Sequence, residues 1–230
     1  SRLLSVAPMM ERTDRHCRYF FRLLSQQTLL YTEMINANAI TKGNRTRLLD
    51  FSEIEHPLAL QIGGSDPKLL AEATKIGVDW GYDEINLNVG CPSSRVSSGD
   101  FGAVLMKRKD HVAKCVDAMA QFSSNVPISV KCRIAVDDQD PEKILPSFIK
   151  TVSNSGVSIF IIHARKAILS GLSPKDNRKI PPIDYNLVKK IKAQYPKLEI
   201  CLNGEIKDLS SVMNFINDGI NGCMIGREVY

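Results

Sequence analysis

The segment Glu84–Ser93, EINLNVGCPS, decides how this chain folds. Polar and apolar residues alternate along its first six positions, which is typical of a β-strand with two different faces. Gly90, Cys91 and Pro92 then end the strand and turn the chain. In parallel α/β proteins, ligands and catalytic groups gather at the carboxyl ends of the strands. The segment therefore predicts a strand that presents the Cys91 thiol at such an edge, although a lone cysteine there is also a common apolar loop residue.

The composition is that of an ordinary soluble globular protein. Of the 230 residues, 43% are hydrophobic and 24% are charged, and no apolar run is long enough to cross a bilayer. We therefore expect one domain, no signal peptide and no membrane association. The six cysteines are widely spaced without a C-x-x-C pair, which favours reduced thiols over disulfides or a metal site. The net charge of +5 mildly favours an anionic partner.

Short apolar runs alternate with amphipathic segments from end to end. The runs predict strands at Leu3–Ala7, Leu29–Met34, Leu58–Ile62, Glu84–Val89, Ile128–Ile134, Ser158–His163, Glu199–Asn203 and Gly222–Ile225. The segments between them predict helices at Asp14–Leu24, Asp66–Gly77, Asp110–Phe122, Asp140–Asn154, Asp184–Gln194 and Asp208–Asn217. The polar stretch Asn36–Arg47 is predicted as a loop with some helix, and Ala164–Pro182 as a long basic loop.

Eight strands separated by helices predict an α/β fold, the (β/α)8 TIM barrel. A doubly wound open sheet is the alternative, and it is disfavoured because no G-x-G-x-x-G follows the first strand. The chain starts almost inside its first strand and ends directly after its last. We therefore expect a barrel truncated after the eighth strand, with the final helix beyond Tyr230.

Several polar residues are predicted to point into the barrel near the carboxyl ends of their strands. They are Gln61, Asn88, Lys131, Arg133, His163 and Asn203. Each has an ordinary explanation alone, such as a lysine that reaches solvent or a histidine satisfied in the core. Lysine and arginine are almost never buried unpaired, however. Together these residues predict a site for a polar ligand.

The residues that follow the last two predicted strands suggest a phosphate-binding site. Asn203, Gly204 and Glu205 follow one strand, and Gly226 and Arg227 follow the next. In many barrels the loops at these two places bind phosphate through backbone N–H groups. The glycines would allow close backbone approach and Arg227 would add a charged fork. A plain turn is the alternative for either glycine alone.

The chain resembles the tRNA-dihydrouridine synthase family, flavoenzymes that reduce uridine in tRNA. The resemblance is strongest to the bacterial subtype that acts on D-loop uridines 20 and 20a. The matching stretches span the whole chain in order: VAPMMERTDRHCR, TEMI, LALQIGG, INLNVGCPSSRV, GAVLMK, KCRI, HARKAILSGLSPKDNRKIPPIDY, LNGEI and MIGR. The Asn-x-Gly-Cys-Pro motif and the Lys-x-Arg and His-Ala-Arg segments are specific to the family.

The resemblance implies a bound FMN across the barrel mouth. It assigns cofactor contacts to Pro8, Met9, Met10, Gln61, Lys131, His163, Asn203, Gly204, Glu205, Gly226 and Arg227. Lys131 would lie near the N1–C2=O edge of the flavin ring, where a cation stabilises the reduced anion. Glu205 departs from the family pattern, which has a glycine there, so its carboxylate is expected to point away from the phosphate.

The implied reaction is reduction of the C5–C6 bond of uracil. NADPH would reduce FMN, the flavin would pass a hydride to C6, and Cys91 would protonate C5 as general acid. An unperturbed thiol, with a pKa of about 8.5, is mostly protonated at neutral pH. Asn88 would position the uracil or its ribose. The target base must leave the tRNA stack, and Arg133, Lys175 and Arg178 are expected to contact the tRNA.

The resemblance also sets expectations for the whole protein. Residues 1–230 would be the FMN-binding catalytic barrel, without the family's C-terminal helical tRNA-binding domain. We expect a monomer that acts in the cytoplasm or an organelle. One alternative is an FMN-dependent enzyme acting on a free pyrimidine, similar to dihydroorotate dehydrogenases. Another is a non-catalytic RNA-binding barrel that has lost its flavin, against which the intact Cys91, Lys131 and His163 argue.

Overall fold

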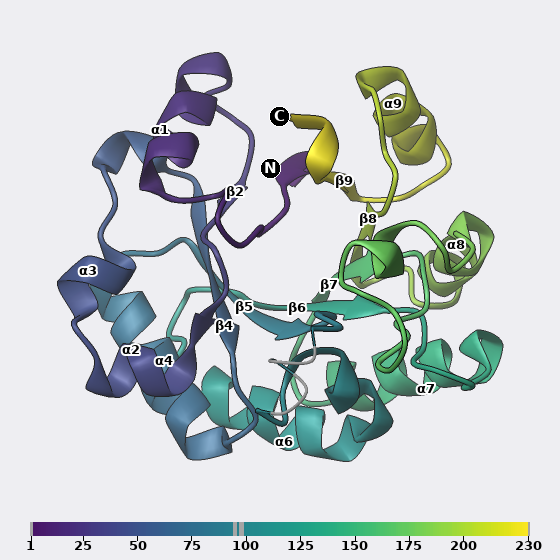
Figure 1. The fold of residues 1–230 in the computed structure, drawn as a ribbon, viewed down its shortest axis with the longest axis horizontal. Helices are drawn as coiled ribbons and strands as arrows, with labels where there is room; N and C mark the ends of the chain where they lie inside the picture. Colours follow the sequence, from purple (N-terminus) through teal and green to yellow (C-terminus); the bar gives the residue numbers. More distant parts are fainter. Residues whose placement is uncertain (1, 94–95, 97–98, 230) are drawn as a thin grey trace.

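The computed structural model describes residues 2–93, 96 and 99–229. Ser94 and Arg95 of the INLNVGCPSSRV stretch lie outside the described residues. Within the described chain, parallel strands form a barrel and helices surround it (Figure 1).

The strands are short and pair in one continuous order. They are β1 (Leu4–Val6), β2 (Leu30–Tyr31), β3 (Ile35–Asn36), β4 (Leu58–Gly63), β5 (Glu84–Val89), β6 (Ile128–Arg133), β7 (Ile159–His163), β8 (Glu199–Asn203) and β9 (Gly222–Ile225). The order around the sheet is β1-β9-β8-β7-β6-β5-β4-β2, and β3 also pairs with β4. β2 and β3 both pair with β4, one after the other along its length, so together they occupy one strand position in the barrel.

The barrel closes between β1 and β2. The Val6 amide donates to the Leu29 carbonyl at 3.0 Å, and the Leu29 amide donates to the Leu4 carbonyl at 3.1 Å. With this bridge, eight strand positions form a ring, and the predicted (β/α)8 barrel is confirmed.

The helices lie on the outside of the ring. They are α1 (Arg15–Leu24), α2 (Ala37–Lys42), α3 (Arg45–Leu49), α4 (Pro67–Trp80), α6 (Lys109–Ala120), α7 (Pro141–Ser153), α8 (Tyr185–Gln194) and α9 (Leu209–Asn217). Aspartate side chains cap the first turns of α1, α4, α7, α8 and α9, as the sequence predicts. None of the helices formed by the described residues has both the length and the apolar character needed to cross a bilayer.

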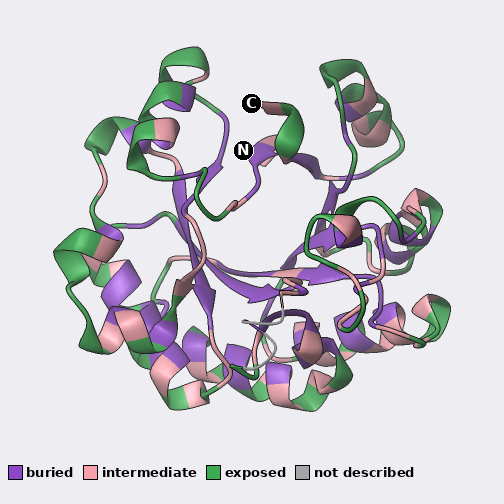
Figure 2. Cartoon of the chain, viewed as in Figure 1, coloured by how far each residue is buried: buried purple, intermediate pink, exposed green. Residues whose placement is uncertain are grey.

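Apolar packing fills both sides of the strands. The larger core lies between the strands and the inner faces of the helices, where buried residues concentrate (Figure 2). A smaller cluster that includes Tyr31, Ile161 and Met224 fills part of the barrel interior. Buried polar side chains fill the rest of the interior, up to the open end of the barrel.

Two predicted elements differ from the structure in type or continuity, and two helices differ in their bounds. The predicted second strand, Leu29–Met34, is broken because Thr32 Oγ1 takes the place of a backbone acceptor and receives the Gln61 amide at 3.0 Å. The stretch Asn36–Arg47 is mostly helical rather than a loop. Asn36 and Asn44 cap α2 and α3, a capping signal that the sequence contained.

Helix α4 runs to Trp80 rather than ending near Gly77. A Cβ on Gly77 would lie 2.7 Å from Leu60 Cδ2 and 2.8 Å from Ile85 Cδ1, so this glycine allows the helix to pack closely on the strands. The true end is at Gly81, whose φ of +100° is the left-handed conformation of a helix C-cap. Helix α6 begins after Arg108, and Asp110 lies in its first turn rather than at the cap.

Candidate active site

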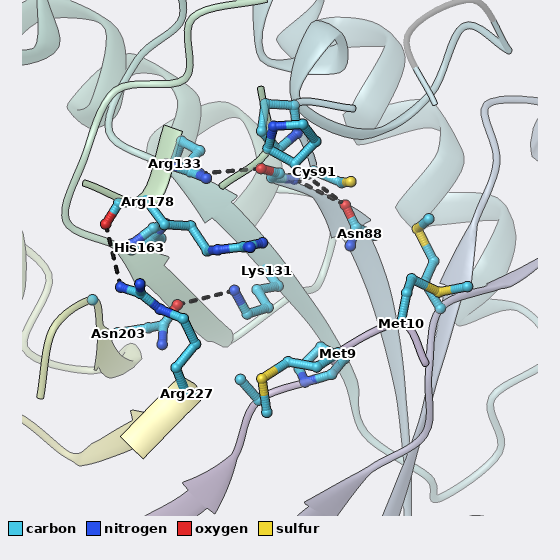
Figure 3. Close-up of a pocket in the computed structure, with 18 of the residues that line it drawn as sticks. Met9, Met10, Asn88, Cys91, Lys131, Arg133, His163, Arg178, Asn203 and Arg227 are labelled. Carbon is cyan, nitrogen blue, oxygen red and sulfur yellow. Dashed lines mark hydrogen bonds between the residues drawn. The ribbon is translucent and has the colours of Figure 1, made fainter. Parts of the chain in front are cut away.

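A cavity of about 680 Å³ opens at the carboxyl ends of the strands (Figure 3). Most of the residues predicted for the site line it: Pro8, Met9, Met10, Gln61, Asn88, Cys91, Lys131, Arg133, His163, Arg178, Asn203, Gly204, Glu205, Gly226 and Arg227. Lys175 is exposed and is not among the described residues that line the cavity. The structure therefore brings together residues that are up to 219 positions apart, from Pro8 to Arg227.

The strand register explains why these side chains meet. Arg133 on β6 pairs with His163 on β7, and His163 pairs with Asn203 on β8. Asn88 on β5 pairs with Lys131 on β6 in the same way. Because residues that are paired in a parallel sheet point to the same face, all five side chains project inward together.

The loop that carries Cys91 is held from both sides. The Asn88 side-chain oxygen accepts the backbone N–H groups of Gly90 at 3.1 Å and Cys91 at 3.0 Å. The Cys91 carbonyl accepts the Ala103 amide at 2.9 Å, and the Gly90 carbonyl accepts Arg133 Nε at 3.1 Å. The thiol is half-buried at the cavity wall, where a bound molecule can reach it (Figure 3).

Lys131 is fixed near the centre of the cavity. Its ammonium donates to Asn203 Oδ1 at 3.1 Å, and Asn203 Nδ2 donates to the Met224 carbonyl at 2.8 Å. The second bond determines which end of the Asn203 amide faces the lysine. Burial, with a smaller contribution from the nearby charge of Arg133, lowers the pKa of Lys131 to about 8.

The cavity is electrostatically suited to an anion. Burial and the surrounding cations hold the pKa of His163 well below its ordinary value, so the imidazole is neutral at pH 7. Burial and then Arg227 lower the pKa of Arg178. Cations outnumber carboxylates in the lining, which contains Arg12, Lys131, Arg133, Arg178 and Arg227 against Glu205 and Glu228. An anionic group would therefore be attracted and would relieve the repulsion among these cations.

The loop after β8 is shaped around His163. Gly204 has a φ of +119°, and a Cβ there would lie 2.7 Å from His163 Cδ2. Tyr185 donates its hydroxyl to the Gly204 carbonyl at 2.6 Å. Only glycine combines this backbone conformation with such close packing. At Gly226 an added Cβ would meet its nearest atom, Ala7 Cβ, at an ordinary 3.9 Å, so packing within the protein does not require glycine there.

Glu205 turns its carboxylate to Arg165. Arg165 Nη2 donates to Glu205 Oε2 at 2.6 Å, and Arg165 also donates to the Pro181 carbonyl. The Glu205 backbone has a φ of +50°, in the left-handed region that favours glycine. The ion pair neutralises the carboxylate and leaves the backbone of this loop as the group that can approach a phosphate.

Arg133 connects two loops at the cavity. Besides Gly90, it donates through Nη1 to the carbonyls of Lys166 at 3.2 Å and Asn177 at 3.1 Å. Its side chain is buried, so most of its donors serve the protein itself. This arrangement supports a role in holding the Cys91 loop against the basic loop after β7, in addition to any contact with a ligand.

Some residues of the cavity were not predicted from the sequence. They include Arg12, Met34, Pro174 and Glu228. Each is close in sequence to a predicted residue or strand end, and Arg12, Met34 and Pro174 lie within stretches that match the family. Among the described residues, no group of three or more His, Cys, Asp or Glu side chains is arranged to hold a metal ion.

A family model and the curated relatives identify the same family. A family model described as dihydrouridine synthase (Dus) matches residues 5–230. The tRNA-dihydrouridine(20/20a) synthase of Synechocystis sp. is 54% identical over 227 residues, covering 99% of this chain and 67% of that protein. The protein of the same name from Salmonella typhi is 55% identical over 227 residues, covering 98% and 68%. The chain therefore spans about two thirds of the length of these relatives.

A solved structure shares the fold at much lower identity. Morphinone reductase superposes with a TM-score of 0.69 over 99% of this chain and 82% of its own, at 11% identity. At that identity the likeness concerns the barrel alone.

Proposed function

The chain belongs to the dihydrouridine synthase family, and we propose that it uses FMN and NADPH to reduce the C5–C6 bond of a D-loop uridine, at position 20 or 20a of tRNA. The observation that carries the proposal is the placement of the Cys91 thiol, held through Asn88, at the wall of a cationic cavity. The barrel, residues 1–230, is in this proposal the catalytic domain.

The cavity fits FMN in size and in chemistry. Its volume of about 680 Å³ lies within the range of roughly 300–1,000 Å³ that is usual for ligand sites. The backbone at Gly204 and Gly226, with Arg227, would hold the phosphate, and Pro8, Met9 and Met10 would line the ring. Gln61 would hydrogen-bond the ring, and Lys131 would face its N1–C2=O edge. The neutral imidazole of His163 packs against Gly204 and would support the ribityl chain.

Bound FMN would supply the hydride that reaches C6 of the uracil, with NADPH as the source of the electrons. The residues of the chain supply the proton and orient the uracil. Cys91 Sγ holds the proton that C5 receives, so that hydride and proton together saturate the bond. The resulting thiolate then regains a proton from water. Asn88 orients the uracil or its ribose next to the thiol.

The basic rim of the cavity supports tRNA as the substrate. Arg178 lines the cavity, and Lys175 lies three residues earlier in the loop after β7, where it is exposed. Cations there can bind the tRNA backbone while the target base leaves the stack and enters the cavity. Such a protein acts where tRNA is found, in the cytoplasm or in an organelle that contains tRNA. The monomeric state stays a prediction.

The first experiment is an absorption spectrum of the purified protein, with mass spectrometry of the molecule that heat releases. We expect the visible bands of an oxidised flavin and a released mass equal to that of FMN. Mapping of dihydrouridine in a tRNA transcript, incubated with the protein and NADPH, then tests the substrate. The expected product is dihydrouridine in the D-loop.

Two results would overturn the proposal. Reduction of free uracil or orotate in the absence of RNA would indicate an enzyme of free pyrimidines. A colourless protein that takes up no added FMN but still binds tRNA would indicate a non-catalytic RNA-binding barrel.

A further inference from the structure

A buried chain of polar side chains runs inside the barrel from its closed end to the cavity. At the closed end, the Glu84 carboxylate accepts hydrogen bonds from Arg2 Nη1, from Ser129 Oγ and from the Tyr31 hydroxyl, the last at 2.8 Å. Ser129 Oγ in turn accepts Asn86 Nδ2 at 2.7 Å. Glu84, Ser129 and Asn86 are each no more than 1% exposed, so water does not compete for these bonds.

The chain continues to the Cys91 loop without a break. Asn86 Oδ1 accepts Gln61 Nε2 at 2.7 Å, and Gln61 Oε1 accepts Asn88 Nδ2 at 2.8 Å. Asn88 Oδ1 then accepts the N–H groups of Gly90 and Cys91. We call Glu84, Ser129, Asn86, Gln61 and Asn88 the polar chain. Glu84 and Asn88 are four residues apart on one strand, a separation of about 13 Å at the usual rise of a parallel strand.

The two ends of the polar chain fix its direction. A carboxylate paired with Arg2 can only accept, so Ser129 must donate its hydroxyl proton to Glu84. Ser129 can then only accept from Asn86, which determines how the Asn86 amide is turned. At the other end the backbone amides of Gly90 and Cys91 can only donate, which demands the same direction.

Reversal of the middle of the chain would create conflicts at both ends. A flipped Asn88 would place its NH2 group against two backbone N–H groups. A Ser129 hydroxyl turned toward Asn86 would leave two oxygens, one of them charged, facing each other at Glu84. Each conflict leaves buried polar groups without partners, which costs free energy comparable to a lost hydrogen bond.

The fixed direction determines what the cavity presents to a ligand. Both lone pairs of Asn88 Oδ1 are occupied and one Nδ2 proton is used, so Asn88 can offer only its second N–H. Gln61 can offer one N–H and one lone pair. Both side chains line the cavity. With the chain reversed, Asn88 would instead present an oxygen with a spare lone pair.

We propose that Glu84, at the closed end of the barrel, is a positioning residue for the reaction. Acting through Ser129 and Asn86, and together with the Gly90 and Cys91 amides at the other end, it holds the amides of Gln61 and Asn88 in the orientation that offers an N–H to the bound ligand. The link to flavin and uracil rests on the proposed function, whereas the orientation of the polar chain itself does not. The alternative is that Glu84 only stabilises the barrel interior.

Two variants and one control separate these roles. Glu84→Gln keeps the shape but lets the residue donate to Ser129, and Ser129→Ala cuts the chain while leaving Glu84 paired with Arg2 and Tyr31. Glu199→Gln is the matched control, because Glu199 also pairs with Arg2, at 3.1 Å, but has no bond to the polar chain among the described contacts. If Glu84→Gln fails to fold, Ser129→Ala still tests the proposal.

The first readout needs no cofactor. The side-chain amide ¹H–¹⁵N signal of Asn88, identified by its loss in Asn88→Asp, is compared among the ligand-free variants. It should shift in Glu84→Gln and Ser129→Ala and stay in place in Glu199→Gln. An unmoved signal in both chain variants would overturn the proposal.

The second readout uses the flavin-loaded protein with tRNA. We expect Glu84→Gln and Ser129→Ala to shift the visible spectrum of bound FMN and to lower kcat by about tenfold, the effect of one misplaced hydrogen bond. KM for tRNA should not change, because the polar chain lies below the rim. A purely structural role predicts a lower melting temperature with kcat and spectrum unchanged.

The two proposals can fail separately. If the wild-type protein binds no FMN but the Asn88 signal shifts as expected, the proposed function fails and the orientation of the polar chain is supported. If the wild-type protein forms dihydrouridine but the variants match it in signal, spectrum and kcat, the positioning role of Glu84 fails alone.

Discussion

At the scale of single residues, Lys131 links the fold to a measurable pH dependence. Burial lowers its pKa to about 8 in the ligand-free protein. A flavin C2=O group that accepts a hydrogen bond from the ammonium would favour the charged form and raise that pKa, so the complex would hold more protons than the free protein above pH 8. We therefore expect the affinity for FMN to fall as the pH rises, to be about tenfold weaker at pH 9 than at pH 7.

Titration calorimetry at several pH values measures this dependence. Lys131→Met has a similar length without the charge and should bind FMN more weakly with a flatter pH profile. An equally steep profile in Lys131→Met would assign the titration to a group other than Lys131.

Cys91 provides a second test at the residue scale. Cys91→Ala should keep bound FMN and the oxidation of NADPH, because the thiol is expected to touch only the uracil. Dihydrouridine formation should fall by roughly 10²- to 10⁴-fold, the usual contribution of a general acid. The matched control is Cys17→Ala, since Cys17 is also half-buried but does not line the cavity. Normal product formation by Cys91→Ala would remove the thiol from the mechanism.

At the scale of elements, the loop after β8 shows how close packing demands a particular residue. Gly204→Ala would place a methyl group 2.7 Å from the His163 ring at a positive φ. We expect the variant to lose roughly 1–3 kcal/mol from overpacking in addition to backbone strain, and to bind FMN more weakly. Denaturant unfolding and an FMN titration measure the two effects.

Gly171→Ala, in the loop after β7, is the control for the Gly204→Ala substitution. Gly171 has a φ of +87°, but no atom lies within 4 Å of the position that a Cβ would take. It should therefore lose stability through backbone strain alone and keep its affinity for FMN. Equal effects of the two substitutions would mean that contact with His163 does not matter.

At the scale of the whole molecule, the chain and its relatives differ in length. The chain spans about two thirds of the length of the curated relatives. We expect the affinity of this chain for tRNA to fall steeply as the salt concentration rises, because cations at the cavity would bind the phosphates of the tRNA backbone. Fluorescence anisotropy with labelled tRNA at several salt concentrations would measure this dependence, and binding that does not respond to salt would contradict the prediction.

Single lysine substitutions test which charges contribute to tRNA binding. Lys175→Ala should reduce the salt dependence of tRNA binding, with a change of about one in the slope of log K against log salt. Lys114→Ala should change little, because Lys114 is exposed on α6, away from the cavity lining. Equal slopes for the two variants would indicate that the loop after β7 does not contact tRNA.

Local sequence patterns predicted most of the strands, the capped helices and the polar residues that face into the cavity. These features depend on local rules, since alternation sets which strand residues face inward and an aspartate before a helix satisfies its first amides. Gln61, Lys131 and His163 were therefore predicted to meet once eight strands were recognised as a barrel. Because the sheet closes into a ring, the inward-facing residues of all strands line the same interior.

Contacts between residues far apart in the chain became visible only in the folded structure. Arg133 donates hydrogen bonds to the Gly90, Lys166 and Asn177 carbonyls, and Arg165 pairs with the Glu205 carboxylate. Glu84, read in the sequence only as one polar position of an alternating strand, proved to begin a directed chain of hydrogen bonds. Which donor meets which acceptor depends on distances across the barrel, and no local pattern in a sequence encodes those distances.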